Sequence, residues 1–325
     1  MAELWLQFIL TIDATLRVAT PLILCAMAGI FSERAGIIDI SLEGKMLMGA
    51  FAAGATAAVT GSALMGLGAA VMVSVLLSLL HGFACITHKG NQVISGLAIN
   101  ILASGLTVTL GIAFFARGGQ TPLLSADSRF GAIHLPLADW LGAHVPLIGT
   151  IYKEIISGHN VLVWLAFALV FVTSYIVFKT SFGLRLRAVG EKPEAVDSAG
   201  MSVSGLRFQA VLIAGILTGL AGAYLSTAHG AGFVREMTAG KGYIALAAMI
   251  FGKWRPGPAL AACLMFGFLD ALAARLQGVS LPYIGEVSTD LILALPYIMT
   301  VVLLAGFIGS ATPPKAIGVP YVKER

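Results

Sequence analysis

Long apolar runs recur along almost the whole chain, and they restrict its fold more than any other feature. A membrane-spanning helix needs about 20 predominantly apolar residues. Nine runs approach this length, at residues 4–31, 46–62, 64–86, 93–115, 160–178, 210–228, 237–252, 258–274 and 289–309. The short run 237–252 also fits a segment that enters the membrane and returns. The sequence therefore predicts an all-α polytopic membrane protein with about nine transmembrane helices, within a range of 8–10.

The composition agrees with a chain that lies mostly in lipid. Of the 325 residues, 58% are hydrophobic and only 11% are charged, whereas soluble domains carry about 25% charged residues. The chain has 38 glycines, and small residues let membrane helices pack closely. We expect residues 1–325 to form a single transmembrane domain in a lipid bilayer. The three cysteines lie singly in apolar runs, without metal-binding or redox spacing.

Lysine and arginine predict which loops face the cytosol. If the spans alternate with residues 179–209 inside, thirteen Lys and Arg residues lie on inner segments, six on outer segments and one in the first span. Inner loops are enriched in these residues, so this orientation places loop 179–209 in the cytosol, and loop 116–159 and the N-terminus outside. The outer loop contains IHLPLADWLGAHVPLIG, which fits an interfacial amphipathic segment and an ordinary loop with apolar anchors equally well.

The cytosolic loop contains a polar run, GEKPEAVDSAGMS, between apolar neighbours. Pro193 suits the first turn of a helix, and Gly200 stands where a left-handed residue ends one. The run predicts a helix over 193–199. A helix this short is not stable alone in water. Either it docks on another surface, or it is a solvated loop helix that packs only on its own chain.

Two segments share a pattern that suggests an internal repeat. Residues 31–54 and 233–252 each run from Phe through an acid–base pair and a Gly–Lys or Lys–Gly step into a helix of small apolar residues. In the predicted orientation they approach the membrane from opposite sides, as the halves of an inverted repeat do near a transport pathway. Chance similarity is the alternative, because Gly and Ala are frequent throughout the chain.

Polar side chains inside apolar runs indicate where a pathway could lie, because they are costly in hydrocarbon. The fourth run carries several such residues, namely Asn91, Gln92, Ser95, Asn100 and Thr107. Hydrogen bonding between helices is the alternative role for each of them. Asn100 is the strongest pathway candidate, because an amide can both donate to and accept from a sugar hydroxyl or a base edge.

Three motifs, in this order, resemble a known family. They are FSERAGIIDISLEGKMLMGAFAA at 31–53, EAVDSAG at 194–200 and GKGYIALAAMIFGKWRPGPAL at 240–260. Together they resemble permease subunits of ABC importers for simple sugars, nucleosides and branched-chain amino acids, most closely the bacterial nucleoside permeases. The resemblance extends over about residues 15–310. Asp39 stands where this family commonly has Asn, which weakens inference about ligand contacts at that position.

The resemblance implies a non-catalytic subunit of the bacterial cytoplasmic membrane that moves a nucleoside or sugar-like solute. It implies a partner ATPase that uses ATP and Mg²⁺, a second permease subunit and an external solute-binding protein, with no nucleic acid and no cofactor or metal of its own. No G-x-x-x-x-G-K-[ST] phosphate loop occurs in the chain. The alternative is a gradient-driven transporter or facilitator that works alone.

In the resembling family, the short cytosolic helix docks in a groove of the ATPase and transmits its closure to the spans. The resemblance assigns this coupling role to Arg185, Arg187, Glu191, Glu194, Asp197, Gly200 and Met201. The charged residues would form the polar rim of the contact. Met201, with Val203, would supply its apolar anchors.

Overall fold

The fold was analysed in a computed structural model of the chain. It describes residues 2–145, 148–276 and 312–323, together with 280–281, 285–286, 294, 298 and 301. The predicted span 289–309 lies almost entirely outside these residues.

The described part is almost entirely helical, as predicted. The longer helices are α1 (Ala2–Arg34), α2 (Leu42–Thr60), α3 (Ala63–Gly82), α4 (Gln92–Phe115), α7 (Val161–Lys179), α8 (Ser181–Glu191), α10 (Val203–Tyr224), α11 (Lys241–Phe251) and α12 (Pro256–Leu276). The short helices are α5 (Ala138–His144), α6 (Ile148–Ile151), α9 (Pro193–Ser198) and the 3₁₀ helix η2 (Ala126–Ser128). Single π-turns form η1 (Phe83–Thr87), η3 (Tyr152–Ile156) and η4 (Leu225–His229). A two-stranded antiparallel ladder pairs β1 (Ser280–Leu281) with β2 (Gly285–Glu286).

Six helices in the described part are long and apolar enough to cross a membrane. They cover Trp5–Arg34, Ala63–Thr87, Gln92–Phe115, Val161–Lys179, Val203–His229 and Pro256–Leu276, and each coincides with a predicted run. The run 46–62 lies in α2, most of whose residues are buried inside the protein. The run 237–252 contains α11, which has 11 residues and is too short to span a bilayer alone.

Helix α1 forms the centre of the packing. It contacts α7, α10, α11 and α12, while α10 packs closely on α2 and α3. Small residues allow the α10–α3 contact, since a β-carbon on Gly219 would lie 2.6 Å from the Cα of Val71. The core is therefore built by close helix packing of the kind expected in a membrane protein.

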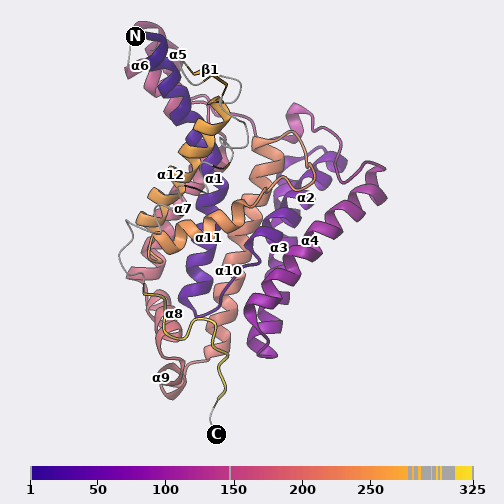
Figure 1. Cartoon of the computed structure of the whole chain (residues 1–325), viewed down its shortest axis with the longest axis vertical. Coiled ribbons are helices and arrows are strands. Elements are labelled where there is room, and N and C mark those ends of the chain that lie inside the picture. The colour runs from indigo at the N-terminus through magenta and orange to yellow at the C-terminus, as the bar shows by residue number, and fades with distance from the viewer. Residues whose placement is uncertain are drawn as a thin grey trace.

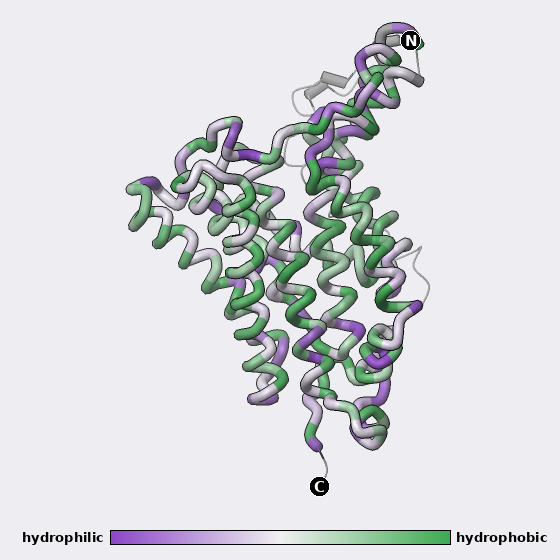
Figure 2. Tube along the Cα trace, turned by 180° about the vertical axis from the view of Figure 1, so that it is seen from behind, coloured by the Kyte–Doolittle hydropathy of each residue, from purple (hydrophilic) through white to green (hydrophobic). Residues whose placement is uncertain are grey.

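The two ends of the molecule carry different segments. The N-terminus lies beside α5 and α6 at one end, and α8, α9 and the C-terminal segment lie at the opposite end (Figure 1). Hydrophobic residues dominate the middle of the long helices, and hydrophilic residues gather mainly towards the two ends (Figure 2). Loop 116–159 and loop 179–209 thus lie at opposite ends, as the charge distribution predicts.

Candidate functional site

Helices α2 and α11 both begin inside the molecule, and their first turns meet there. Helix α11 crosses the middle of the molecule over α1 (Figure 1). Glu43, the second residue of α2, accepts hydrogen bonds from the backbone N–H groups of Gly240 at 2.9 Å and Gly242 at 2.6 Å. Amides in a first helical turn have no partner within the helix, and a carboxylate complements the helix dipole there. The two segments with the shared sequence pattern therefore contact each other directly.

Asn100 of α4 joins the same two helix starts. Its Oδ1 accepts from the backbone N–H of Gly44 at 2.8 Å, and its Nδ2 donates to the carbonyl of Ile40 at 3.0 Å and to the Tyr243 hydroxyl at 2.8 Å. Ser41, the N-cap residue of α2, makes no capping bond with its own side chain, so Asn100 supplies the cap from another helix. A β-carbon on Gly44 would lie 2.8 Å from the Asn100 Cα, so glycine permits this approach.

A buried ion pair fixes the connection between α1 and α2. Lys45 Nζ lies 2.8 and 2.7 Å from the two carboxylate oxygens of Asp39, and both side chains are fully buried. The Ser41 hydroxyl also donates to Asp39, at 2.5 Å. Burying two charges is costly, and removing only one of them is more costly still. This pair therefore holds residues 35–41 rigidly against the start of α2.

Two other helices, α3 and α4, hold the backbone of Ile38, the residue before Asp39. His81 Nε2 lies 3.0 Å from the Ile38 carbonyl, and because a carbonyl only accepts, Nε2 carries the proton. His81 Nδ1 then accepts from the Ser95 hydroxyl at 3.0 Å. Gln92 Oε1 accepts from the Ile38 N–H at 2.7 Å. Ser95 and Gln92 thus bind the α1–α2 connection to α4.

We use the name central polar cluster for Glu43, Asn100, Ser104, Glu236 and Tyr243. Ser104 donates to the exposed Glu236 carboxylate at 2.5 Å, which links α4 to the segment before α11. Tyr243 is 44% exposed, so the cluster opens to one face of this chain. Its carboxylates, amide and phenol offer both hydrogen-bond donors and acceptors.

The polar run in the cytosolic loop forms the predicted short helix. Helix α9 has Pro193 in its first turn, and Gly200 follows it with a left-handed φ of 78°. Val196 of α9 packs in a buried cluster with Val189 and Val203, and this packing anchors the inner face of the helix to the rest of the chain. Val203, expected on the outer face, therefore points into the protein. Met201 is half-buried against the same cluster.

The charged residues of α8 and α9 divide into two groups. Arg185, Glu191 and Glu194 are exposed at the end of the molecule. Arg187 instead stacks inward, with its guanidinium carbon 5.1 Å from the centre of the Phe178 ring. Asp197 forms an ion pair with Lys323 at 3.3 Å. The exposed charges of α8 and α9 are thus those of Arg185, Glu191 and Glu194, with the exposed Lys192 between the two helices.

Residues 312–323, which we name the C-terminal strap, run along this end of the molecule. The strap donates from Ala316 N–H to the Gly190 carbonyl at 2.8 Å and from Gly318 N–H to the Gly36 carbonyl at 3.0 Å. The fully buried Arg207 donates to the carbonyls of Ala35 and of Val319, each at 3.2 Å. The strap therefore joins the end of α8 to the segment that leads into α2.

The five residues predicted to line the pathway lie in different places in the structure. Asn91 is the N-cap of α4, where it accepts from the N–H groups of Val93 and Ile94. Thr107 donates to the carbonyl of Ser104 in its own helix. Gln92 and Ser95 contact the α1–α2 connection, and Asn100 alone of the five belongs to the central polar cluster.

Sequence reasoning missed Glu43 and Tyr243. Glu43 is an acid directly before an apolar run, which by itself marks a functional candidate, but its partners lie 197 and 199 residues away. Within the described residues no group of three or more His, Cys, Asp or Glu side chains is placed to hold a metal ion.

A bundle of apolar helices with polar helix starts meeting at its centre is the architecture of a membrane transport protein. The family model described as "Branched-chain amino acid transport system / permease component" matches residues 11–304. This match covers most of the chain, so the chain belongs to that family of permeases.

Three relatives of this chain are named as permeases of ABC transporters. The chain is 39% identical over 321 residues to the guanosine ABC transporter permease protein NupQ of Bacillus subtilis, covering 97% of each chain. It is 36% identical to the nucleoside ABC transporter permease protein NupC of Lactococcus lactis, covering 94% of this chain and 95% of the relative. It is 37% identical to TsgC13 of Haloferax volcanii, provisionally named as a glucose ABC transporter permease, covering 83% and 78%.

Proposed function

We propose that this permease is the membrane subunit of an ATP-driven ABC importer that moves nucleosides into the cell. The supporting observation is its similarity over nearly the full length of two nucleoside permeases, at 39% and 36% identity. A subunit of this kind performs no catalysis, and ATP hydrolysis belongs to a partner ATPase. The further partners are a second, identical or homologous permease and an external solute-binding protein. The membrane is the bacterial cytoplasmic membrane.

We infer that the central polar cluster lines the translocation pathway. Asn100 and Tyr243 come from different helices and meet at the starts of α2 and α11. Their amide and hydroxyl groups match the uncharged donors and acceptors of a ribose and a base. Asp39 and Lys45 are fully buried beside this cluster, so they position it without touching solute.

We propose that the chain contains about nine membrane segments, of which α2 and α11 do not span the membrane as full-length apolar helices. The six long candidate helices, the predicted span 289–309, the buried α2 and the short α11 together give about nine membrane segments. In this arrangement α2 and α11 are the corresponding elements of an inverted repeat, whose broken helices point their N-termini towards the solute.

We infer that α9 is the element that couples this permease to the ATPase. It lies at one end of the molecule, and its inner face is anchored by Val196. Its outer face presents the exposed Glu194, with Glu191 beside it at the end of α8. A rigid helix with one packed and one free face is suited to transmit a movement of a partner to the spans.

Uptake assays test the proposed function. The chain is co-expressed with its candidate partner ATPase, second permease and binding protein, in cells that lack nucleoside uptake. We expect saturable uptake of labelled guanosine that disappears when the ATPase phosphate-loop lysine is replaced. Uptake that survives this replacement would identify a stand-alone carrier instead.

A simple sugar is the second candidate solute, because the Haloferax relative carries a glucose assignment. Labelled glucose and ribose supplied to the same cells separate the two candidates. ATPase-dependent uptake of sugar without uptake of guanosine would support the assignment as an ABC importer but would reject nucleosides as its solute.

A further inference from the structure

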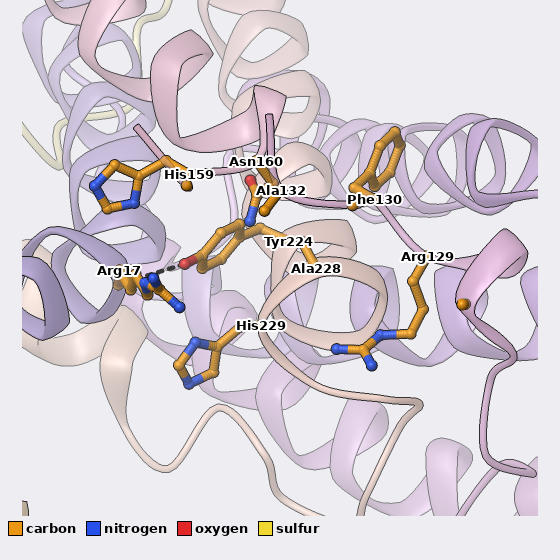
Figure 3. A pocket seen from close by; sticks show the side chains of 12 residues that line it. Arg17, Arg129, Phe130, Ala132, His159, Asn160, Tyr224, Ala228 and His229 are labelled. Atoms are coloured by element: carbon orange, nitrogen blue, oxygen red, sulfur yellow. Dashed lines mark hydrogen bonds between the residues drawn. The ribbon is translucent and has the colours of Figure 1, made fainter. Parts of the chain in front are cut away.

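A cavity of about 310 Å³ lies near the end of the molecule that carries the N-terminus and loop 116–159. Helix α1, the π-turn η4 and two loop segments, 126–132 and 158–160, form its walls. Figure 3 shows the Arg17 and Arg129 side chains reaching into this space from opposite sides, with Tyr224 and His229 between them. The central polar cluster contributes none of its lining residues.

The walls of this cavity are fixed by hydrogen bonds between segments distant in sequence. The Tyr224 hydroxyl donates to the Arg17 carbonyl at 2.8 Å and ties α10 to α1. Phe130 N–H donates to the Thr227 carbonyl at 2.8 Å. Ile133 N–H donates to the His159 carbonyl at 2.9 Å. The space between the two arginines is therefore preformed.

Arg129 is the unusual residue of the cavity. Its Nε is buried and has no hydrogen-bond partner in the described part of the chain, and none of the ion pairs there includes its side chain. The other unpaired buried nitrogen of the cavity walls, His159 Nδ1, is an acceptor, because Nε2 of that ring carries the proton. A buried donor without a partner carries an uncompensated desolvation penalty, which is larger when the group is charged. Native structures seldom retain such a group unless an ion or a water molecule completes its hydrogen bonding.

The other charges around the cavity leave an excess of positive charge. Arg17 is paired with Asp13 at 3.1 Å. Near the other side of His229, Lys241 and Asp270 lie 3.8 Å apart and offset each other. None of the ion pairs of the described residues includes Arg129. One full positive charge thus faces the cavity without compensation.

Burial opposes a positive charge on His159, one of the two histidines that line the cavity. His159 Nε2 donates to the Ile155 carbonyl at 2.9 Å, and burial lowers the pKa of this side chain. His159 is therefore neutral at pH 7. His229 stacks on Tyr224, with ring centres 5.9 Å apart, and forms part of the floor.

We propose that this cavity is an anion site that binds a phosphate group between Arg17 and Arg129. Guanidinium groups recognise phosphate oxygens through paired N–H donors, and the volume is at the small end of ligand cavities, which start near about 300 Å³. A nucleoside carries no negative charge, so the transported solute does not account for the two arginines. The phosphate can come from a phospholipid headgroup or from free phosphate. The exclusion of the transported solute as the ligand rests on the proposed nucleoside function, whereas the binding test below is carried out without any transported solute.

Thermal unfolding of the purified full chain in detergent tests the site. The probes are inorganic phosphate, short-chain dioctanoyl phosphatidylglycerol, and dioctanoylglycerol as the matched lipid without phosphate. The variants are Arg129→Gln and, as a matched control, Arg117→Gln, since Arg117 is an exposed arginine in the same loop. A ligand that binds only the folded state raises the unfolding temperature in proportion to its occupancy.

We expect a phosphate-bearing probe to stabilise the wild type and Arg117→Gln, and to bind Arg129→Gln about tenfold more weakly or worse. Stabilisation by inorganic phosphate identifies a free anion as the ligand. Stabilisation by phosphatidylglycerol alone identifies a lipid headgroup.

Two results would overturn the proposal. One is equal stabilisation of Arg129→Gln and wild type by the phosphate probes. The other is no effect of either phosphate probe on the wild type, which would leave an acidic side chain of a partner protein as the group facing Arg129. Circular dichroism of Arg129→Gln establishes that the variant is folded.

Discussion

Tyr243 gives the most direct residue-scale test of solute contact. Its hydroxyl accepts from Asn100, so its own hydrogen is free to donate to a solute, and the ring is 44% exposed. We expect Tyr243→Phe to raise the KM for nucleoside uptake about 2- to 10-fold, since a neutral hydrogen bond contributes roughly 0.5–1.5 kcal/mol. Initial uptake rates over a range of guanosine concentrations measure this effect. Thr109→Ala, which removes only a bond within α4, is the control, and an unchanged KM in Tyr243→Phe would exclude Tyr243 from the pathway.

The Asp39–Lys45 pair predicts a large effect on stability. Asp39→Asn leaves the Lys45 charge buried without a counter-charge, and removing one partner of a buried pair costs about 3–5 kcal/mol. We expect a lower unfolding temperature in detergent for Asp39→Asn and recovery of most of the loss in Asp39→Asn with Lys45→Met. A double variant as unstable as the single one would show that the carboxylate acts through another contact, such as that with Ser41.

At the scale of elements, α9 can be tested by a charge reversal that leaves its packing intact. Glu194 is exposed, whereas Asp197 is already paired with Lys323, so Glu194→Lys is the cleaner change. If α9 docks on the ATPase, we expect uptake to fall about 5- to 150-fold, as for a coupling free energy of roughly 1–3 kcal/mol. Membrane level and unfolding temperature of the permease should not change. Asp127→Lys, at the opposite end of the molecule, is the matched control, and full uptake by Glu194→Lys would contradict the coupling role.

The sequence predicted helices correctly where neighbouring residues alone determine the length or the ends of the helix. The helix expected over 193–199 forms over Pro193–Ser198, because proline and glycine set its ends through their own backbone preferences. The six long apolar helices were likewise visible as runs. Run length could not show that α2 begins at Leu42, because its start carries two charged residues: Glu43 is bound by backbone N–H groups 197 and 199 residues away, and Lys45 is paired with Asp39.

The central polar cluster depends on contacts that no local pattern encodes. Asn100 was identified because its amide lies within an apolar run. Glu43 and Tyr243 gain their roles only when α11 packs against α2, nearly 200 residues away in sequence. The coupling residues illustrate the same limit, since Arg187 turns inward to Phe178 and Val203 is buried, while the resemblance to the permease family assigned both of them to the same contact as Glu194.

At the scale of the whole molecule, the C-terminal strap connects the end that carries α9 with the centre. It contacts Gly190 at the end of α8 and Gly36 at the start of the α1–α2 connection. His81 and the Asp39–Lys45 pair hold the later part of this connection, at Ile38 and Asp39. Hydrogen bonds at the strap and at Asn100, joined by the covalent chain from Gly36 to Gly44, thus link the proposed coupling end to the central polar cluster. Coupling along this route can be measured by combining substitutions.

Removal of residues 312–325 tests this connection. The deletion takes away the Val319 carbonyl that accepts from the buried Arg207, and an unpaired buried donor costs roughly 1–3 kcal/mol, or more when charged. We expect the shortened chain to reach the membrane but to lose uptake while the partner ATPase still hydrolyses ATP. A chain that ends at Lys323 keeps the described strap and is the matched control.

The combination with Arg207→Met decides whether the strap acts through this arginine. If it does, the deletion and the substitution share one effect, so the double variant should take up nucleoside no worse than the more impaired single variant. Losses that multiply in the double variant would show that the strap and Arg207 act independently. In that case the strap would stabilise the cytosolic end without transmitting movement to α2, and the connection from α9 to the centre would have to pass through the packing of α8 and α10 instead.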